Sequence, residues 1–157
     1  MTSPSHPTID GPEGPVAQVL ALLAEHAAAH EARDAAALLA LYAPDAVSYT
    51  LAPPLQQGPE TAYGTAEGVQ RWFETFDGPV GISYRDPVVT VAGDLALVHC
   101  LTRMTARPQG SGSPFSFWMR STFGVRHVGA RWVIVHRHES TPFHMDGSFR
   151  AAVDLLP

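Results

Sequence analysis

Near its C-terminal end the chain contains a long stretch with the alternating side-chain pattern of β-strands. This stretch restricts the fold more than any other feature. Residues 117–143 read FWMRSTFGVRHVGARWVIVHRHESTPF. Two segments rich in β-branched and aromatic residues flank the short sequence His127-Val128-Gly129. This pattern predicts two antiparallel strands joined by a tight turn. The rest of the chain is therefore expected to build a sheet around this hairpin.

The length of the turn decides which side chains of the hairpin share a face. A three-residue loop that ends on Gly129 in the left-handed conformation is a common hairpin solution. With this loop, Arg120 lies across from His136 and Trp118 lies across from His138. We favour this register because it gathers polar and aromatic groups on one apolar surface, as small-molecule pockets require.

A two-residue loop is the alternative. It would place Arg120 on the face of Arg137 and Glu139, because side chains along a strand alternate with a period of two. The favoured register instead predicts a pocket wall on the other face. That wall would consist of Trp118, Arg120, Thr122, Ile134, His136, His138 and Ser140.

Composition limits the protein to one globular domain. A chain of 157 residues with 45% hydrophobic and 16% charged residues can bury a substantial core, and we place the domain at residues 15–157. Residues 1–14, rich in Pro, Ser and Gly, are expected to form a mobile tail. The formal charge of −5 argues against nucleic acid as a partner. The absence of lysine excludes Schiff-base chemistry and a P-loop lysine.

The single cysteine and the N-terminal sequence give information about where in the cell the protein is located. Cys100 lies in an apolar strand pattern, where we expect a buried and unreactive thiol. No apolar run reaches the length of a membrane span, and the N-terminus lacks the charged and apolar regions of a signal peptide. These features predict a soluble cytoplasmic protein without a membrane partner.

Helical periodicity and capping residues predict three helices before the long strands. The helices are expected at residues 15–30, 35–43 and 66–76, with Asp34 and Thr65 as N-caps of the second and third. His26 and His30 lie four residues apart on one face of the first helix, and we expect them either in solvent or at the edge of the core. Trp72, in the apolar stripe of the third helix, is expected in the core and also on a cavity wall.

Strand patterns follow at residues 46–51, 82–91 and 95–106, and the C-terminal residues 144–157 could add a short helix. Helices followed by long antiparallel strands predict an α+β fold, with a curved, mostly antiparallel sheet wrapped around the N-terminal helices. The proline-rich loop at residues 51–64 could be a lid or pocket rim, or a passive connector. The face carrying Phe117, Met119, Phe123, Val133 and Val135 needs a cover, so we expect a homodimer through the outer sheet face.

The order of these elements resembles the nuclear transport factor 2-like superfamily, and within it the SnoaL-like and ketosteroid isomerase-like proteins. The resemblance is carried by RDAAALLALYAPDAVSY at residues 33–49, WF at 72–73, GDLALVH at 93–99 and the long segment at 118–148. It implies a cone formed by a curved sheet and closed by helices, with a ligand cavity inside. The steroid isomerase base aligns with Thr50, its oxyanion tyrosine with His26, and its protonated aspartate near Thr122 or Arg120.

Three functions are consistent with these residues. The first is an isomerase, cyclase or hydratase that moves a proton on an oxygenated, partly apolar substrate without a cofactor. In it, His136 or His138 acts as the base with help from Arg120. Trp118, Thr122, Tyr49, His99, Ser140 and Trp72 would then line the substrate pocket. The second is a non-catalytic ligand-binding dimer. The third, ranked last, is a metal site built from His99, His136 and His138, with His144 as a further candidate ligand.

Overall fold

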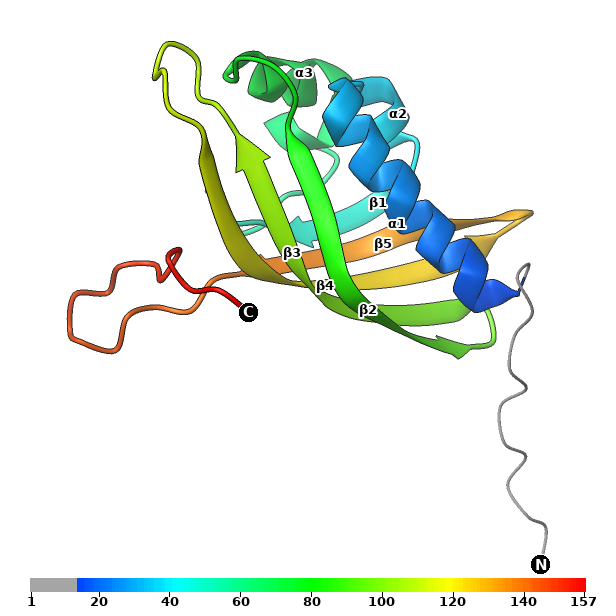
Figure 1. Cartoon of the computed structure of the whole chain (residues 1–157). Helices are drawn as coiled ribbons and strands as arrows, with labels where there is room; N and C mark the ends of the chain where they lie inside the picture. The colour runs from blue at the N-terminus through cyan, green and yellow to red at the C-terminus, as the bar shows by residue number, and fades with distance from the viewer. Residues whose placement is uncertain (1–13) are drawn as a thin grey trace, which may run out of the picture.

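A curved five-stranded sheet partly surrounds three helices in the computed structural model, which describes residues 14–157 (Figure 1). The tail predicted over residues 1–14 therefore falls almost entirely outside the described residues. The helices are α1 (Pro15–Ala32), α2 (Ala35–Leu39) and α3 (Ala66–Glu74), with a 3-10 turn, η1 (Ala62–Gly64). The strands are β1 (Tyr42–Tyr49), β2 (Gly81–Ala92), β3 (Leu95–Ala106), β4 (Phe115–Val128) and β5 (Arg131–Ser140).

The strand order β1-β5-β4-β3-β2 leaves β1 and β2 as the two edges of the sheet. Strand β1 runs parallel to β5, and every other neighbouring pair is antiparallel. The predicted α+β class and the curved, mostly antiparallel sheet are thus confirmed, although the sheet is open and does not close into a barrel. Within residues 14–157, no helix has the length and apolarity needed to cross a bilayer.

Two predicted caps position the short helices. The Asp34 carboxylate accepts a hydrogen bond from the backbone N–H of Ala37 at 2.8 Å, and the Thr65 hydroxyl accepts one from Gly68 at 3.1 Å. Helix α2 is shorter than predicted because the chain enters β1 already at Tyr42, which pairs with Ile134 of β5. Tertiary strand pairing has therefore replaced the last helical turn that local sequence favours.

Two apolar clusters hold the helices against the concave face of the sheet. Beneath α1, Val19, Leu22 and Leu23 pack against buried residues of the sheet, among them Val98, Phe123 and Ile134. Beneath α2 and α3, the second cluster contains Ala29, Ala35, Leu38, Val69, Phe73, Val80 and Ala106. Cys100 is buried in the first cluster as predicted, and burial raises the pKa of its thiol.

The hairpin register differs from the favoured prediction. Val128 pairs directly with Arg131, so the loop has two residues, of which Gly129 has a φ of 63°. The pairing then shifts once: Val125 lies opposite Ile134, but Gly124 lies opposite His136. Val135 is thus an extra residue on β5, which is a β-bulge. Arg120 pairs with Ser140 rather than with His136.

The bulge reverses the faces of β5 along its length. Ile134, before the bulge, is buried in the core under α1, whereas Arg137 and Glu139, after the bulge, line the interior. His136 and His138 therefore point to the outer face of the sheet, since side-chain direction alternates along a strand.

The same geometry corrects the reason given for a dimer. Met119 and Phe123 are buried and Phe117 borders the interior cavity, so these residues do not form an uncovered outer face. The helices already cover them.

The C-terminal segment forms turns rather than the predicted short helix. It folds back on itself through hydrogen bonds from the His144 N–H to the Arg150 carbonyl, 2.9 Å, and from the Ala152 N–H to the Pro142 carbonyl, 2.8 Å.

Gly68→Ala should destabilise the protein by about 1–3 kcal/mol, because a Cβ at Gly68 would overlap the backbone carbonyl of Ala62 in the adjoining turn. Gly58→Ala is the matched control, since a Cβ there meets nothing within 4 Å. Urea denaturation of both variants measures the difference. Equal stability of the two variants would contradict the packing described between α3 and η1.

Candidate active site

A cavity of about 510 Å³ lies between the inner face of the sheet, helices α2 and α3, and the loop at residues 51–64. Its size is in the range of small-molecule sites. Much of its wall is apolar or aromatic, including Leu38, Val69, Trp72, Phe115, Phe117 and Met119. The polar side chains on the wall include His30, Tyr42, Ser48, Gln57, Arg137 and Glu139. An apolar wall with a few polar groups is the usual composition of a ligand pocket.

Arg137 and Glu139 form an ion pair on the cavity wall. The Arg137 Nε and a Glu139 carboxylate oxygen are 3.7 Å apart, and the two side chains are 16% and 13% exposed. This distance is too long for a hydrogen bond, and the Arg137 Nε has no other partner. Within residues 14–157, the Glu139 side chain makes no hydrogen bond. Its carboxylate oxygens can therefore accept a hydrogen bond or a proton from a molecule in the cavity.

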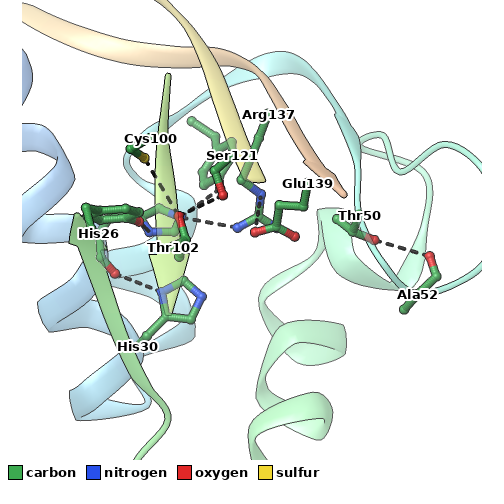
Figure 2. A network of polar contacts seen from close by, with 11 residues as sticks. His26, His30, Thr50, Ala52, Cys100, Thr102, Ser121, Arg137 and Glu139 are labelled. Carbon is green, nitrogen blue, oxygen red and sulfur yellow. Dashed lines mark hydrogen bonds and ion pairs between the residues drawn. The ribbon is translucent and has the colours of Figure 1, made fainter. Parts of the chain in front are cut away.

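Behind this pair, His26 is 2% exposed and contacts three polar groups. Its Nε2 lies 2.9 Å from the Tyr42 hydroxyl and 3.3 Å from an Arg137 amino group, and its Nδ1 lies 2.6 Å from the Tyr84 hydroxyl. A guanidinium can only donate, so Nε2 must be the unprotonated nitrogen. The proton is then on Nδ1 and is donated to Tyr84. Figure 2 shows Arg137 between the histidine pair and Glu139.

The surroundings keep both helix histidines neutral. Burial lowers the pKa of His26 well below its ordinary value, and the nearby His30 and Arg137 lower it further. Burial also lowers the pKa of His30 to about 4, although the hydrogen bond to the His26 carbonyl opposes this change. His30 donates that bond from Nδ1 at 2.8 Å, which leaves the lone pair on Nε2.

Arg137 stays charged in this setting. Burial by itself lowers the pKa of its guanidinium, but the charge of Glu139 and the neighbouring Tyr42 and Tyr84 outweigh burial and raise the pKa above its ordinary value. The guanidinium carbon also lies 5.8 Å from the centre of the Tyr42 ring, a cation–π contact. Burial raises the pKa of Tyr42 to about 12, so this phenol keeps its proton at neutral pH.

The loop at residues 51–64 forms part of the cavity wall, as the pocket-rim alternative predicts. Its anchor is Gln57, which pairs with Ser48 of β1 through backbone hydrogen bonds of 2.8 and 2.9 Å. Thr50, at the position of the steroid isomerase base, also borders the cavity, but its hydroxyl donates to the carbonyl of Ala52 at 3.2 Å.

Of the site residues predicted from the sequence, Trp72 borders the cavity as expected. The other eight are absent from the cavity wall: His136, His138, Arg120, Trp118, Thr122, Tyr49, His99 and Ser140. Their predicted placement inside is wrong. These residues share one face much as predicted, because Thr122 pairs with both His138 and His99 and Arg120 pairs with Ser140, but the helices cover the opposite face of the sheet.

On that outer face the predicted residues are only partly brought together. The Tyr49 ring lies 4.9 Å from the ring of His136 and 5.7 Å from that of His138. His136 donates from Nδ1 to the Val47 carbonyl at 2.8 Å. His99 lies opposite Thr122, one strand further away. In the described part of the chain, no three His, Cys, Asp or Glu side chains gather closely enough to hold a metal ion.

Sequence reasoning missed the inward-facing groups of β5 and the residues behind them. The sequence analysis placed Arg137 and Glu139 on the face opposite the predicted pocket wall. The i, i+4 pair of His26 and His30 was a usable signal, because it predicts two imidazoles on one helical face. Buried at 2% and 4% exposure, this face packs against the sheet.

The SnoaL-like domain family matches residues 19–144. The chain is a member of this family. No curated protein matches it. Among solved structures, an NTF2-like protein of unknown function from Pseudomonas putida KT2440 is 30% identical, with a TM-score of 0.75 over 90% of this chain and 95% of that chain. This likeness places the SnoaL-like chain in the NTF2-like superfamily.

Two further structures share the fold at lower identity. A provisionally named scytalone dehydratase from Novosphingobium aromaticivorans has 15% identity and a TM-score of 0.71, covering 87% of this chain and 90% of that chain. A provisionally named dehydratase of the NTF2-like family from Streptomyces avermitilis has 19% identity and a TM-score of 0.69, covering 82% and 97%. At these identities the likeness concerns the fold.

The neutral, buried histidines should make stability fall in mild acid. Between the ordinary value of 6.5 and the value of about 4 in the folded protein, His30 takes up a proton only in the unfolded chain. Unfolding then binds protons, so the free energy of unfolding decreases as pH falls, by about 1.4 kcal/mol per pH unit for each such histidine. His26 adds to this slope in the same direction.

Urea denaturation at intervals from pH 7.5 to 5 measures the slope. His30→Gln should reduce it by about 1.4 kcal/mol per pH unit, and Gln70→Ala, which removes no ionisable group from an exposed position of α3, should leave it unchanged. An unaltered slope in His30→Gln would show that this histidine is not held neutral.

Proposed function

We propose that the protein is an enzyme of the isomerase or cyclase type that moves a proton on a carbon next to a carbonyl group. The substrate is a partly apolar, oxygenated ring compound held in the cavity. The observation that carries this proposal is the Glu139 carboxylate, which is 13% exposed, lies on the cavity wall and has only the ion pair with Arg137 as a polar partner in the described chain.

The proposed chemistry uses Glu139 as the base. The carboxylate takes a proton from the carbon next to the carbonyl, and the electron pair of that C–H bond moves onto the carbonyl oxygen as an enolate. Arg137, which remains charged, stabilises the negative oxygen. Return of the proton from Glu139 to a different carbon completes an isomerisation. Alternatively, the enolate carbon attacks a second carbonyl and closes a ring, and the alkoxide that forms takes the proton back from Glu139.

The proton that Glu139 removes must later be delivered by an acid in the cavity, either to a carbon or to an oxygen. Two other polar groups of the wall are poor sources of it at neutral pH. His30, with a pKa of about 4, carries no extra proton at neutral pH, and its Nδ1 proton is committed to the His26 carbonyl. Tyr42, with a pKa of about 12, is a poor acid as well. The cavity therefore offers a base and a cation, and the proton can return from the same base.

The proposed reaction belongs to the class predicted from the sequence, but a different residue acts as the base. The predicted base, His136 or His138, lies outside the cavity wall, as does Arg120. The roles of base and cation pass to Glu139 and Arg137, which face the interior. A binding protein without turnover is the second candidate, because a largely apolar cavity of about 510 Å³ could hold a ligand without any reaction.

Deuterium exchange separates the two candidates. We expect the wild-type protein to accelerate exchange of the C1 protons of 2-tetralone, a bicyclic ketone, in D₂O followed by NMR. Glu139→Gln should reduce the acceleration about 100-fold or more, because the amide cannot accept the proton.

His138→Gln is the matched comparison, since it alters the base that sequence reasoning preferred. It should leave exchange unchanged, because His138 lies on the outer face of the sheet. Loss of exchange in His138→Gln with retention in Glu139→Gln would favour the outer site. Binding of 2-tetralone with no accelerated exchange would favour the binding protein.

We further propose that the chain forms a homodimer through the outer face of the sheet. Leu95 and Leu97 of β3 and Val88 of β2 are 51%, 50% and 49% exposed, which leaves apolar area uncovered near one end of this face. Native mass spectrometry should give twice the mass of one chain, and Leu97→Arg should shift the population toward the single chain. A wild-type protein that is monomeric at micromolar concentration would contradict the dimer.

A further inference from the structure

His30 carries a hydrogen-bond acceptor that the protein leaves unused. Its Nδ1 donates to the His26 carbonyl at 2.8 Å, and the other ring nitrogen, Nε2, has no hydrogen-bond partner within residues 14–157. Because the ring is neutral and its proton is on Nδ1, Nε2 carries a lone pair and can only accept. Figure 2 shows the two nitrogens on opposite sides of the ring, with Nε2 turned away from His26.

This nitrogen is accessible from the cavity. The unpaired side-chain atoms that the described residues enclose completely are the Nε atoms of Arg33 and Arg137 and the Oε1 of Gln57. His30 Nε2 is unpaired but is not among these enclosed atoms, so a water-sized molecule can reach it. His30 borders the cavity and is only 4% exposed in total, so the cavity is the space from which Nε2 is reached.

His30 also lies close to the ion pair of Arg137 and Glu139. Its ring centre is 4.5 Å from that of His26, and the His26 Nε2 is 3.3 Å from an Arg137 amino group. The positive charge of Arg137 is near enough to lower the pKa of His30. The same charge opposes a positively charged donor at Nε2, so a neutral hydroxyl group is favoured there over an ammonium group.

An aromatic side chain next to His30 offers a surface for the ring that would carry this hydroxyl. The ring of Trp72 lies edge-on to that of His30, with 6.0 Å between the ring centres, and Trp72 also borders the cavity. A flat apolar surface beside a single acceptor suits an aromatic alcohol, whose ring packs on the wall while its O–H group reaches the acceptor.

We infer that His30 Nε2 accepts a hydrogen bond from a hydroxyl group of the substrate, so that the preferred substrates are ring ketones with a hydroxyl group on an aromatic ring. The inference rests on the proposed function for the carbonyl that Arg137 and Glu139 engage. In this role His30 selects the substrate and transfers no proton to or from carbon. An ether or carbonyl oxygen at the same place would set one lone pair against another and would bind more weakly.

Isothermal titration calorimetry at pH 7.5 with four pairs of probes tests this role. The probes are the 5-, 6-, 7- and 8-hydroxy-2-tetralones and the methoxy counterpart of each, so that the hydroxyl group is offered at every free position of the aromatic ring. We expect the wild-type protein to bind at least one hydroxy compound about tenfold more tightly than its methoxy counterpart, because only the hydroxy compound can donate to Nε2.

His30→Phe keeps a flat ring but removes the acceptor, and it should abolish this preference. His138→Phe is the matched control, because it makes the same change outside the cavity wall, and it should retain the preference. Glu139→Gln should retain it as well, because the hydroxyl group is assigned to His30.

Nitrogen NMR of the wild-type protein, labelled with ¹⁵N-histidine, decides the matter if His30→Phe does not fold. The Nε2 resonance of His30, assigned through the ring contact with Trp72, should move upfield when the preferred hydroxy compound binds. The methoxy counterpart should leave this resonance in place, because it has no proton to donate.

Each outcome distinguishes this inference from the proposed reaction. Equal affinity within all four pairs would overturn the role of His30, as would a preference that persists in His30→Phe or an Nε2 resonance that does not move. A preference lost in Glu139→Gln and retained in His30→Phe would assign the hydroxyl group to Glu139 instead. Selective binding that depends on His30, without accelerated deuterium exchange, would contradict only the proposed reaction. Failure of every probe to bind would overturn the assignment of this substrate class.

Discussion

The position of one extra residue in β5 determines what the interior of this protein can do. Val135 interrupts the pairing of β4 and β5, and beyond it the side chains of β5 change faces. Ile134 completes the core under α1, whereas Arg137 and Glu139 enter the cavity. Without the bulge, the imidazoles of His136 and His138 would face the interior in place of this ion pair.

Burying a charged guanidinium in the protein interior costs desolvation free energy, and the groups around Arg137 offset this cost. Glu139 supplies the opposite charge at 3.7 Å, and the neutral His26 accepts a hydrogen bond from the guanidinium at 3.3 Å. Tyr84 and Tyr42 in turn occupy the two ring nitrogens of His26. The buried histidines therefore help to support the charged pair. Burial, and to a smaller extent the charge of Arg137, lowers the pKa of both histidines.

The extent to which the sequence predicts this structure differs between the fold and the site. Strand β3 was predicted at the bounds observed, Leu95–Ala106, because its alternation is regular and both its neighbours are antiparallel. The caps Asp34 and Thr65 were also predictable, since their side chains bond locally. Local chemistry and periodicity were sufficient for these features.

The site depends on which alternate side chains of β5 face the interior, and the residues alone do not determine this. In the segment from Trp132 to His138, both sets of alternating residues include apolar side chains that could face the core. A single added residue therefore changes which set is inside. Gly124, opposite His136 at the shift, accommodates the bulge without a distinctive motif. The place of Gln57 on the cavity wall could not be predicted either, because it arises from a bridge between a loop and an edge strand that are separated in the sequence.

That bridge has a consequence for how the cavity could evolve. Between Thr50 and Gln57 the chain runs outward, and Leu55 at its tip is 97% exposed. The two ends of this excursion are held by β1 and by the Ser48 pairing, so insertions or substitutions at the tip leave the wall preorganised. The excursion thus combines an exposed tip that tolerates substitution with a fixed inner edge that forms part of the cavity wall.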